Sequence, residues 1–114
     1  MWVRGNTEEK QMLGSFSLTP LGASDSVGDV VAGCVRIIRD SGLPNETSAM
    51  FTTVEGSPAE VFDLIQRCMD YAQQHAPRVS VVAKFDLRPG HEDALIGKVA
   101  RVEQALESGT DPRD

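Results

Sequence analysis

Residues 57–88 read SPAEVFDLIQRCMDYAQQHAPRVSVVAKFDLR, and this stretch decides the fold. It opens on Ser57-Pro58-Ala59-Glu60, a capping box with proline at the first helical position, which predicts the start of a helix. The apolar residues that follow at helical spacing are Val61, Leu64, Ile65, Cys68, Met69 and Ala72. The pattern predicts a helix over residues 58–75 with this stripe buried, and Pro77 closes the segment.

The second half of the stretch alternates with the period of a β-strand. One predicted face is apolar and consists of Val79, Val81, Ala83, Phe85 and Leu87. The opposite face carries Ser80, Val82, Lys84, Asp86 and Arg88. This alternation predicts a strand over residues 78–88. By the same patterns, we expect the phenylalanines to be mostly core residues: Phe16, Phe51, Phe62 and Phe85.

Toward the N-terminus, residues 26–41 have the spacing of another amphipathic helix. Its apolar residues are Val27, Val30, Val31, Cys34, Val35 and Ile38. Ser26 can cap its start, and Gly42, followed by Leu43-Pro44, is a strong stop signal. Residues 11–19 alternate as a strand, which we expect Pro20 and Gly22 to end.

The remaining segments complete the order of elements. Residues 45–55 suit extended structure, as one long strand or two short ones, and residues 92–107 suit a third helix. Two amphipathic helices can cover one face of a small sheet and leave the other face open. The sequence therefore predicts an α+β chain with one domain over residues 11–108, a disordered or loosely packed extension over residues 1–10, and a tail over residues 109–114.

Composition excludes several functional classes. The 114 residues carry a net charge of −6 and no basic cluster, which argues against nucleic acid as a partner. No apolar run is long enough to span a membrane, and the first residues do not resemble a signal peptide, so we expect a cytoplasmic protein. Cys34 and Cys68 match no zinc pattern with the two histidines, so we expect buried, reduced thiols, no metal and no cofactor.

Three sets of polar residues are candidates for binding. Lys84, Asp86 and Arg88 share one strand face, either as a ligand site or charged interface or as a solvated face. Glu55 ends a strand just before a glycine, where a carboxylate could pair with an aminopyrimidine or simply be solvated. The hydroxyls of Ser15, Ser17 and Thr19 could bind a ligand or only permit close packing. Phe51 could stack on a flat ring.

Three blocks resemble the thiamine-binding-protein-like family in order and spacing. They are residues 17–22 (SLTPLG), 46–56 (ETSAMFTTVEG) and 77–88 (PRVSVVAKFDLR), and the resemblance covers roughly residues 11–107. It departs at Asn45, where many relatives carry an aromatic residue, and at Phe51, where many carry glycine. The ten-residue extension at the N-terminus is also atypical.

The resemblance implies a ferredoxin-like sandwich in which residues 45–55 form two short strands. It implies subunits that pair through their sheets, as a dimer or dimer of dimers, and a site for thiamine or its hydroxymethylpyrimidine part near a subunit interface. The residues at matching positions are Ser17, Thr52, Glu55, Lys84, Asp86 and Arg88.

Three hypotheses for function remain open at this stage. The leading one is non-enzymatic binding of thiamine or a related pyrimidine. The second is a structural or regulatory homo-oligomer whose open sheet face serves assembly only. The third is an enzyme with Asp86, Glu55 or His91 as acid–base groups, although the sequence lacks the common nucleophile, phosphate-loop and metalloprotease motifs.

Overall fold

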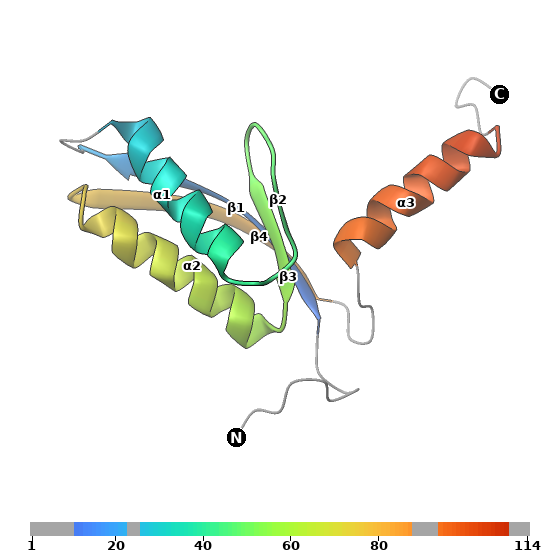
Figure 1. Ribbon diagram of the computed structural model, residues 1–114, viewed down its shortest axis with the longest axis horizontal. Coiled ribbons are helices and arrows are strands. Elements are labelled where there is room, and N and C mark those ends of the chain that lie inside the picture. The colour runs from blue at the N-terminus through green and yellow to red at the C-terminus, as the bar shows by residue number, and fades with distance from the viewer. Residues whose placement is uncertain (1–10, 23–25, 88–93, 110–114) are drawn as a thin grey trace.

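The computed structural model describes residues 11–22, 26–87 and 94–109 (Figure 1). Its elements, in chain order, are β1 (Met12–Leu21), α1 (Val27–Asp40), β2 (Asn45–Thr47), β3 (Thr52–Gly56), α2 (Pro58–Gln73), β4 (Arg78–Leu87) and α3 (Ala94–Glu107). Residues 45–55 thus form two short strands, as the family resemblance implied. The predicted extension over residues 1–10 and nearly all of the tail lie outside the described residues.

The strands form one antiparallel sheet in the order β2-β3-β1-β4. Helices α1 and α2 cover one of its faces, and neither covers the other (Figure 1). This confirms the predicted α+β, ferredoxin-like architecture with helices on one side. β1 pairs with β4 along its whole length but with β3 only as far as Phe16, so its last five residues have no β3 partner.

β1 continues through Pro20 to Leu21, two residues further than predicted. Proline lacks a backbone N–H and is tolerated in a strand where that group is not needed for pairing. Pro20 lies in the part of β1 that has only β4 beside it, so one edge of the strand needs no donor there. The local signal for a strand end was therefore overridden by the pairing with β4.

The two helices under the sheet differ at their starts. The capping box of α2 is present as predicted: the Glu60 N–H donates to Ser57 Oγ at 3.2 Å, and the Ser57 N–H donates to Glu60 Oε1 at 2.9 Å. Ser26 occupies the corresponding position of α1 in an extended conformation, but its side chain makes no capping hydrogen bond. The predicted role of Ser26 as a side-chain cap was wrong.

The core lies between the sheet and the two helices. The largest fully buried side chains include Val30, Ile38, Val54, Val61 and Leu64. Cys34 and Cys68 belong to the same cluster and are free thiols, as predicted.

The C-terminal half of β4 is not part of this core. Phe62 on α2 and Phe85 on β4 stack with ring centroids 4.9 Å apart, yet both are exposed, as is Leu87. The expectation that Phe62 and Phe85 are core residues was wrong. β4 is an edge strand, and nothing in the described residues lies beyond it in the sheet.

Helix α3 leaves the two-layer body, as Figure 1 shows at the C-terminal end of the chain. Its start touches the body, because the Leu95 N–H donates to Glu55 Oε1 at 3.3 Å. Four of its apolar side chains are exposed, with exposed fractions of 53% to 68%: Ile96, Val99, Val102 and Leu106. These side chains lie along one side of α3, and the described residues leave each of them more than half exposed. We call them the exposed stripe of α3.

Candidate functional site

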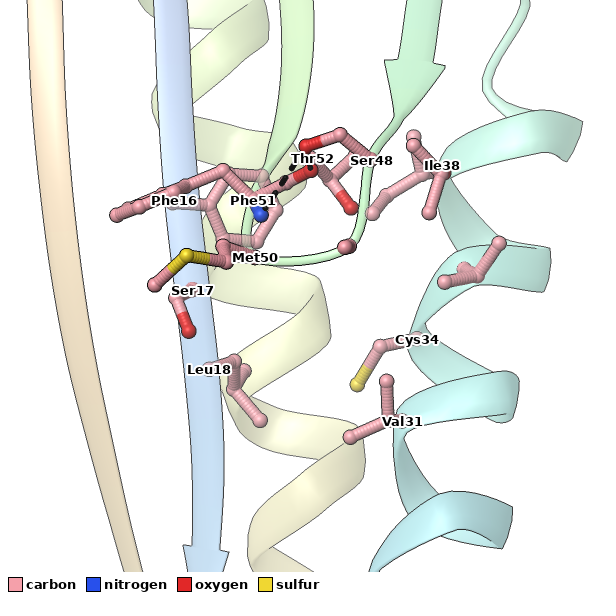
Figure 2. A pocket seen from close by; sticks show the side chains of 13 residues that line it. Phe16, Ser17, Leu18, Val31, Cys34, Ile38, Ser48, Met50, Phe51 and Thr52 are labelled. Carbon is pink, nitrogen blue, oxygen red and sulfur yellow. Dashed lines mark hydrogen bonds between the residues drawn. The ribbon is translucent and has the colours of Figure 1, made fainter.

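A cleft of about 210 Å³ opens between β1, α1 and the connection from β2 to β3 (Figure 2). We call it the helix-side cleft. It is lined by Phe16, Ser17, Leu18, Val31, Cys34, Val35, Ile38 and residues 47–52. The cleft exists because β1 runs beyond the end of β3, so α1 and the β2–β3 connection face each other across the uncovered part of the strand.

No charged side chain lines the helix-side cleft. Its walls are mostly apolar, and the polar residues among those that line it are Ser17, Thr47, Ser48, Thr52 and Cys34. A hydroxyl can both donate and accept a hydrogen bond. The cleft therefore suits a neutral, flat molecule with a few polar atoms at its rim.

The β2–β3 connection is held by its own hydrogen bonds. The Ser48 N–H and hydroxyl both donate to the Phe51 carbonyl oxygen, at 2.8 and 2.9 Å, and the Phe51 N–H donates to Ser48 Oγ at 3.4 Å. These bonds fix the backbone that carries Met50 and Phe51 at the cleft (Figure 2). Thr52 follows as the first residue of β3, and its side chain is buried.

A second polar region lies on the open face of the sheet. The register places Glu55, Leu13 and Asp86 in one row across three strands, and Thr53, Ser15 and Lys84 in the next. The Thr53 hydroxyl donates to Ser15 Oγ at 3.1 Å. Lys98 of α3 forms an ion pair with Asp86, and both line a hollow with Lys84 and Ser15.

The predicted binding residues thus divide between two regions. Ser17 and Thr52 line the helix-side cleft, whereas Lys84 and Asp86 line the open-face hollow. Arg88 lies outside the described residues. Sequence reasoning missed Cys34 and the cleft wall on α1, because the pattern of these residues is that of an ordinary helix core. It also missed Lys98, because no local pattern determines where α3 lies.

Glu55 is buried, with 3% of its surface exposed, and it accepts the N–H of Leu95 in the first turn of α3. A carboxylate at a helix N-terminus is stabilised by the free N–H groups and by the helix dipole. This contact identifies Glu55 as an anchor for α3. The alternative that Glu55 is simply solvated was wrong, because its side chain is buried.

Two further features are absent from the described ranges. No group of three histidine, cysteine or carboxylate side chains there is arranged to hold a metal ion. None of the helices in the same ranges has the length and apolar character needed to cross a membrane.

The sequence model of the thiamine-binding protein family matches residues 14–103. The UPF0045 protein Mb1933 of Mycobacterium bovis is 51% identical over 96 residues, covering 83% of this chain and 94% of that protein. The UPF0045 protein sll0230 of Synechocystis is 33% identical over 92 residues, covering 80% of this chain and 76% of the relative.

Solved structures have the same fold. A domain of unknown function from Bacillus cereus, DUF77, superposes with a TM-score of 0.76 at 28% identity, covering 85% of this chain and 94% of that one. A candidate thiamine biosynthesis/salvage protein of Thermotoga maritima superposes with a TM-score of 0.70 at 23% identity, covering 81% and 98%. At that identity, the second match supports the fold alone.

Proposed function

Because this chain belongs to the thiamine-binding protein family, we propose that it binds thiamine, or the hydroxymethylpyrimidine part of thiamine, without catalysing a reaction. We place the pyrimidine ring in the helix-side cleft. The observation that carries this placement is a ring-sized, uncharged cleft with hydroxyls at its edge. Two buried free thiols fit a reducing compartment, so we propose that the protein acts in the cytoplasm.

The size of the cleft decides which part of thiamine it would enclose. Sites for drug-sized ligands usually measure about 300–1,000 Å³, and the helix-side cleft, at about 210 Å³, is smaller. It suits one substituted ring. The cationic thiazolium ring would then lie at the mouth, where a protein of net charge −6 favours a positive group.

The polar groups match the pyrimidine. An aminopyrimidine offers ring nitrogens as acceptors and an exocyclic amine as donor, and the Thr52 hydroxyl at the cleft can serve either. Phe51 supplies an aromatic ring at the cleft, on a backbone held by Ser48. Aromatic rings stack favourably on flat heterocycles. On this proposal, Phe51 lines the site and does not block it.

A thermal-shift series with thiamine, its mono- and diphosphate, and hydroxymethylpyrimidine tests the proposal. A ligand at about 100 times its dissociation constant adds about 2.7 kcal/mol to the unfolding free energy, which raises Tm by several degrees. We expect Thr52→Val to weaken binding about tenfold, because valine keeps the shape and removes one hydrogen bond.

Thr53→Val is the matched control, since Thr53 is the next residue and lines the open face instead of the cleft. We expect its affinity to equal that of the unmodified protein. If Thr52→Val bound the ligand normally and Thr53→Val bound it more weakly, the ligand would bind on the open face and not in the cleft. No shift with any of the four compounds at millimolar concentration would end the ligand proposal.

A separate observation favours self-association, as a dimer or dimer of dimers. β4 is an edge strand of ten residues, with Val82, Phe85 and Leu87 exposed on or beside it. A long, apolar edge strand is a template for pairing with another chain. The exposed stripe of α3 is a second surface of this kind. We propose that second copies of the chain cover both surfaces, and that Lys84, Asp86 and Lys98 lie near the contact.

A further inference from the structure

Cys34 and Cys68 face each other where α1 crosses α2. The Cys34 thiol donates to the Cys68 carbonyl oxygen at an Sγ–O distance of 3.6 Å, and the Cys68 thiol donates to the Cys34 carbonyl oxygen at 3.8 Å. Each sulfur therefore lies against the backbone of the other cysteine. The protein contains no third cysteine, so this pair holds all of its thiols.

The helices approach closely at this crossing. A Cβ added to Gly33, the neighbour of Cys34, would lie only 2.2 Å from the hydroxyl oxygen of Tyr71 on α2. Ala72, also small, is fully buried beside the pair. A disulfide needs Cα atoms about 4.4–6.8 Å apart, and small residues at a crossing allow two helix backbones to come that near.

The two thiols differ in access and in ionisation. Cys34 lines the helix-side cleft, whereas Cys68 does not line it and is fully buried. When Cys34 ionises, the Cys68 thiol can turn its proton from the Cys34 carbonyl oxygen to the Cys34 sulfur, and this hydrogen bond lowers the pKa of Cys34, although burial acts in the opposite direction. The same hydrogen bond, together with burial, raises the pKa of Cys68. Cys34 is thus the better nucleophile, and a small oxidant can reach it through the cleft.

We propose that Cys34 and Cys68 form an internal redox pair that a hydroperoxide converts to a disulfide joining α1 to α2. The Cys34 thiolate sulfur attacks the terminal oxygen of the hydroperoxide, so that an S–O bond forms, the O–O bond breaks, and the other oxygen leaves as alkoxide, or as hydroxide from hydrogen peroxide. The Cys68 sulfur then attacks the resulting sulfenic acid, an S–S bond forms, and the departing hydroxide takes the thiol proton as water. With hydrogen peroxide, two thiols and one peroxide give one disulfide and two waters.

The disulfide would alter the wall of the helix-side cleft that Cys34 forms. Any effect on ligand affinity therefore rests on the proposed function, whereas formation of the disulfide does not. For this reason the test measures thiols and not ligand binding, so that failure of one proposal can be told apart from failure of the other.

The test treats the folded, reduced protein with hydrogen peroxide, denatures it, blocks the remaining thiols with a maleimide, and measures intact mass. We expect both thiols to be lost together, giving a single chain that carries no maleimide and is lighter than the reduced, unlabelled chain by two hydrogens. Dithiothreitol should restore both thiols. Cys68→Ser should stop at a sulfenic acid on Cys34 that dimedone traps. Cys34→Ser should react at least about tenfold more slowly, because the remaining thiol is buried and has a raised pKa.

Three results would overturn the proposal. One is persistence of two free thiols at peroxide concentrations that oxidise a free cysteine. Another is a product consisting only of sulfinic acid or of disulfides between chains. The third is equal rates for the two serine variants, each checked by circular dichroism for a native helix content, with Cys34→Ala and Cys68→Ala as replacements if either serine variant does not fold.

Discussion

Replacing Val99 and Val102 together by glutamate is expected to abolish the contact between chains that α3 makes, so that the protein in solution contains fewer chains of 12.3 kDa than the unmodified protein. Both residues lie on the exposed stripe of α3, which no described part of the same chain covers. Burying a valine side chain contributes about 1.5–3 kcal/mol to the free energy of association. Losing two such contributions lowers the affinity between chains at least about a hundredfold. Light scattering coupled to size-exclusion chromatography measures the mass.

The matched control carries the same change in net charge on the other side of α3. Arg101→Gln with Gln104→Glu also lowers the charge by two, and both positions are exposed. We expect this variant to keep the mass of the unmodified protein. A monomeric unmodified protein, or an unchanged mass in the valine variant, would show that α3 does not mediate assembly.

Leu64→Ala is expected to lower the free energy of unfolding by about 2–5 kcal/mol, the range for removing a leucine from a packed core. Leu64 lies on the sheet-facing side of α2, and its exposed fraction is 0%. The helices and the sheet share one core, so the cavity would weaken both layers. Urea unfolding followed by circular dichroism gives the value.

Gln73→Ala is the control for this experiment, because Gln73 is an exposed residue at the end of the same helix. We expect a change within about 0.5 kcal/mol, as for most surface substitutions. A loss below about 1 kcal/mol for Leu64→Ala would contradict the placement of the core between α2 and the sheet.

The helices and long strands could be predicted because their signals are local. In α2, the capping box, the proline at the first position and the apolar stripe all indicate the same helix, and the structure contains each of them. Residues 45–55 were ambiguous, since their composition fits one strand or two. Only the family resemblance implied the division that the structure has between β2 and β3.

Burial on β4 could not be predicted from alternation. Alternation tells which residues share a face, but not how far the covering helices extend over it. Val79 and Val81 are partly buried against the core, whereas Phe85 and Leu87 share their face and remain exposed at the sheet edge. The position of an edge strand depends on the strand order, which the sequence pattern does not contain.

The candidate site was only partly visible in the sequence. Lys84 and Asp86 could be placed on one face because strand geometry requires it. The approach of Lys98 to Asp86 depends on where α3 lies, and the anchoring of that helix by Glu55 is a contact across 40 positions of sequence. The helix-side cleft arises from the different lengths of β1 and β3, which no motif encodes.

The most direct test of ligand binding in the helix-side cleft is an amide chemical-shift titration of the ¹⁵N-labelled protein with thiamine and with hydroxymethylpyrimidine. We predict saturable changes that are largest at residues 16–18, 31, 34, 35, 38 and 47–52, which line the cleft. The largest changes at residues 13, 15, 53 and 84–86 would place the ligand on the open face instead. No saturable change at millimolar ligand would contradict binding altogether.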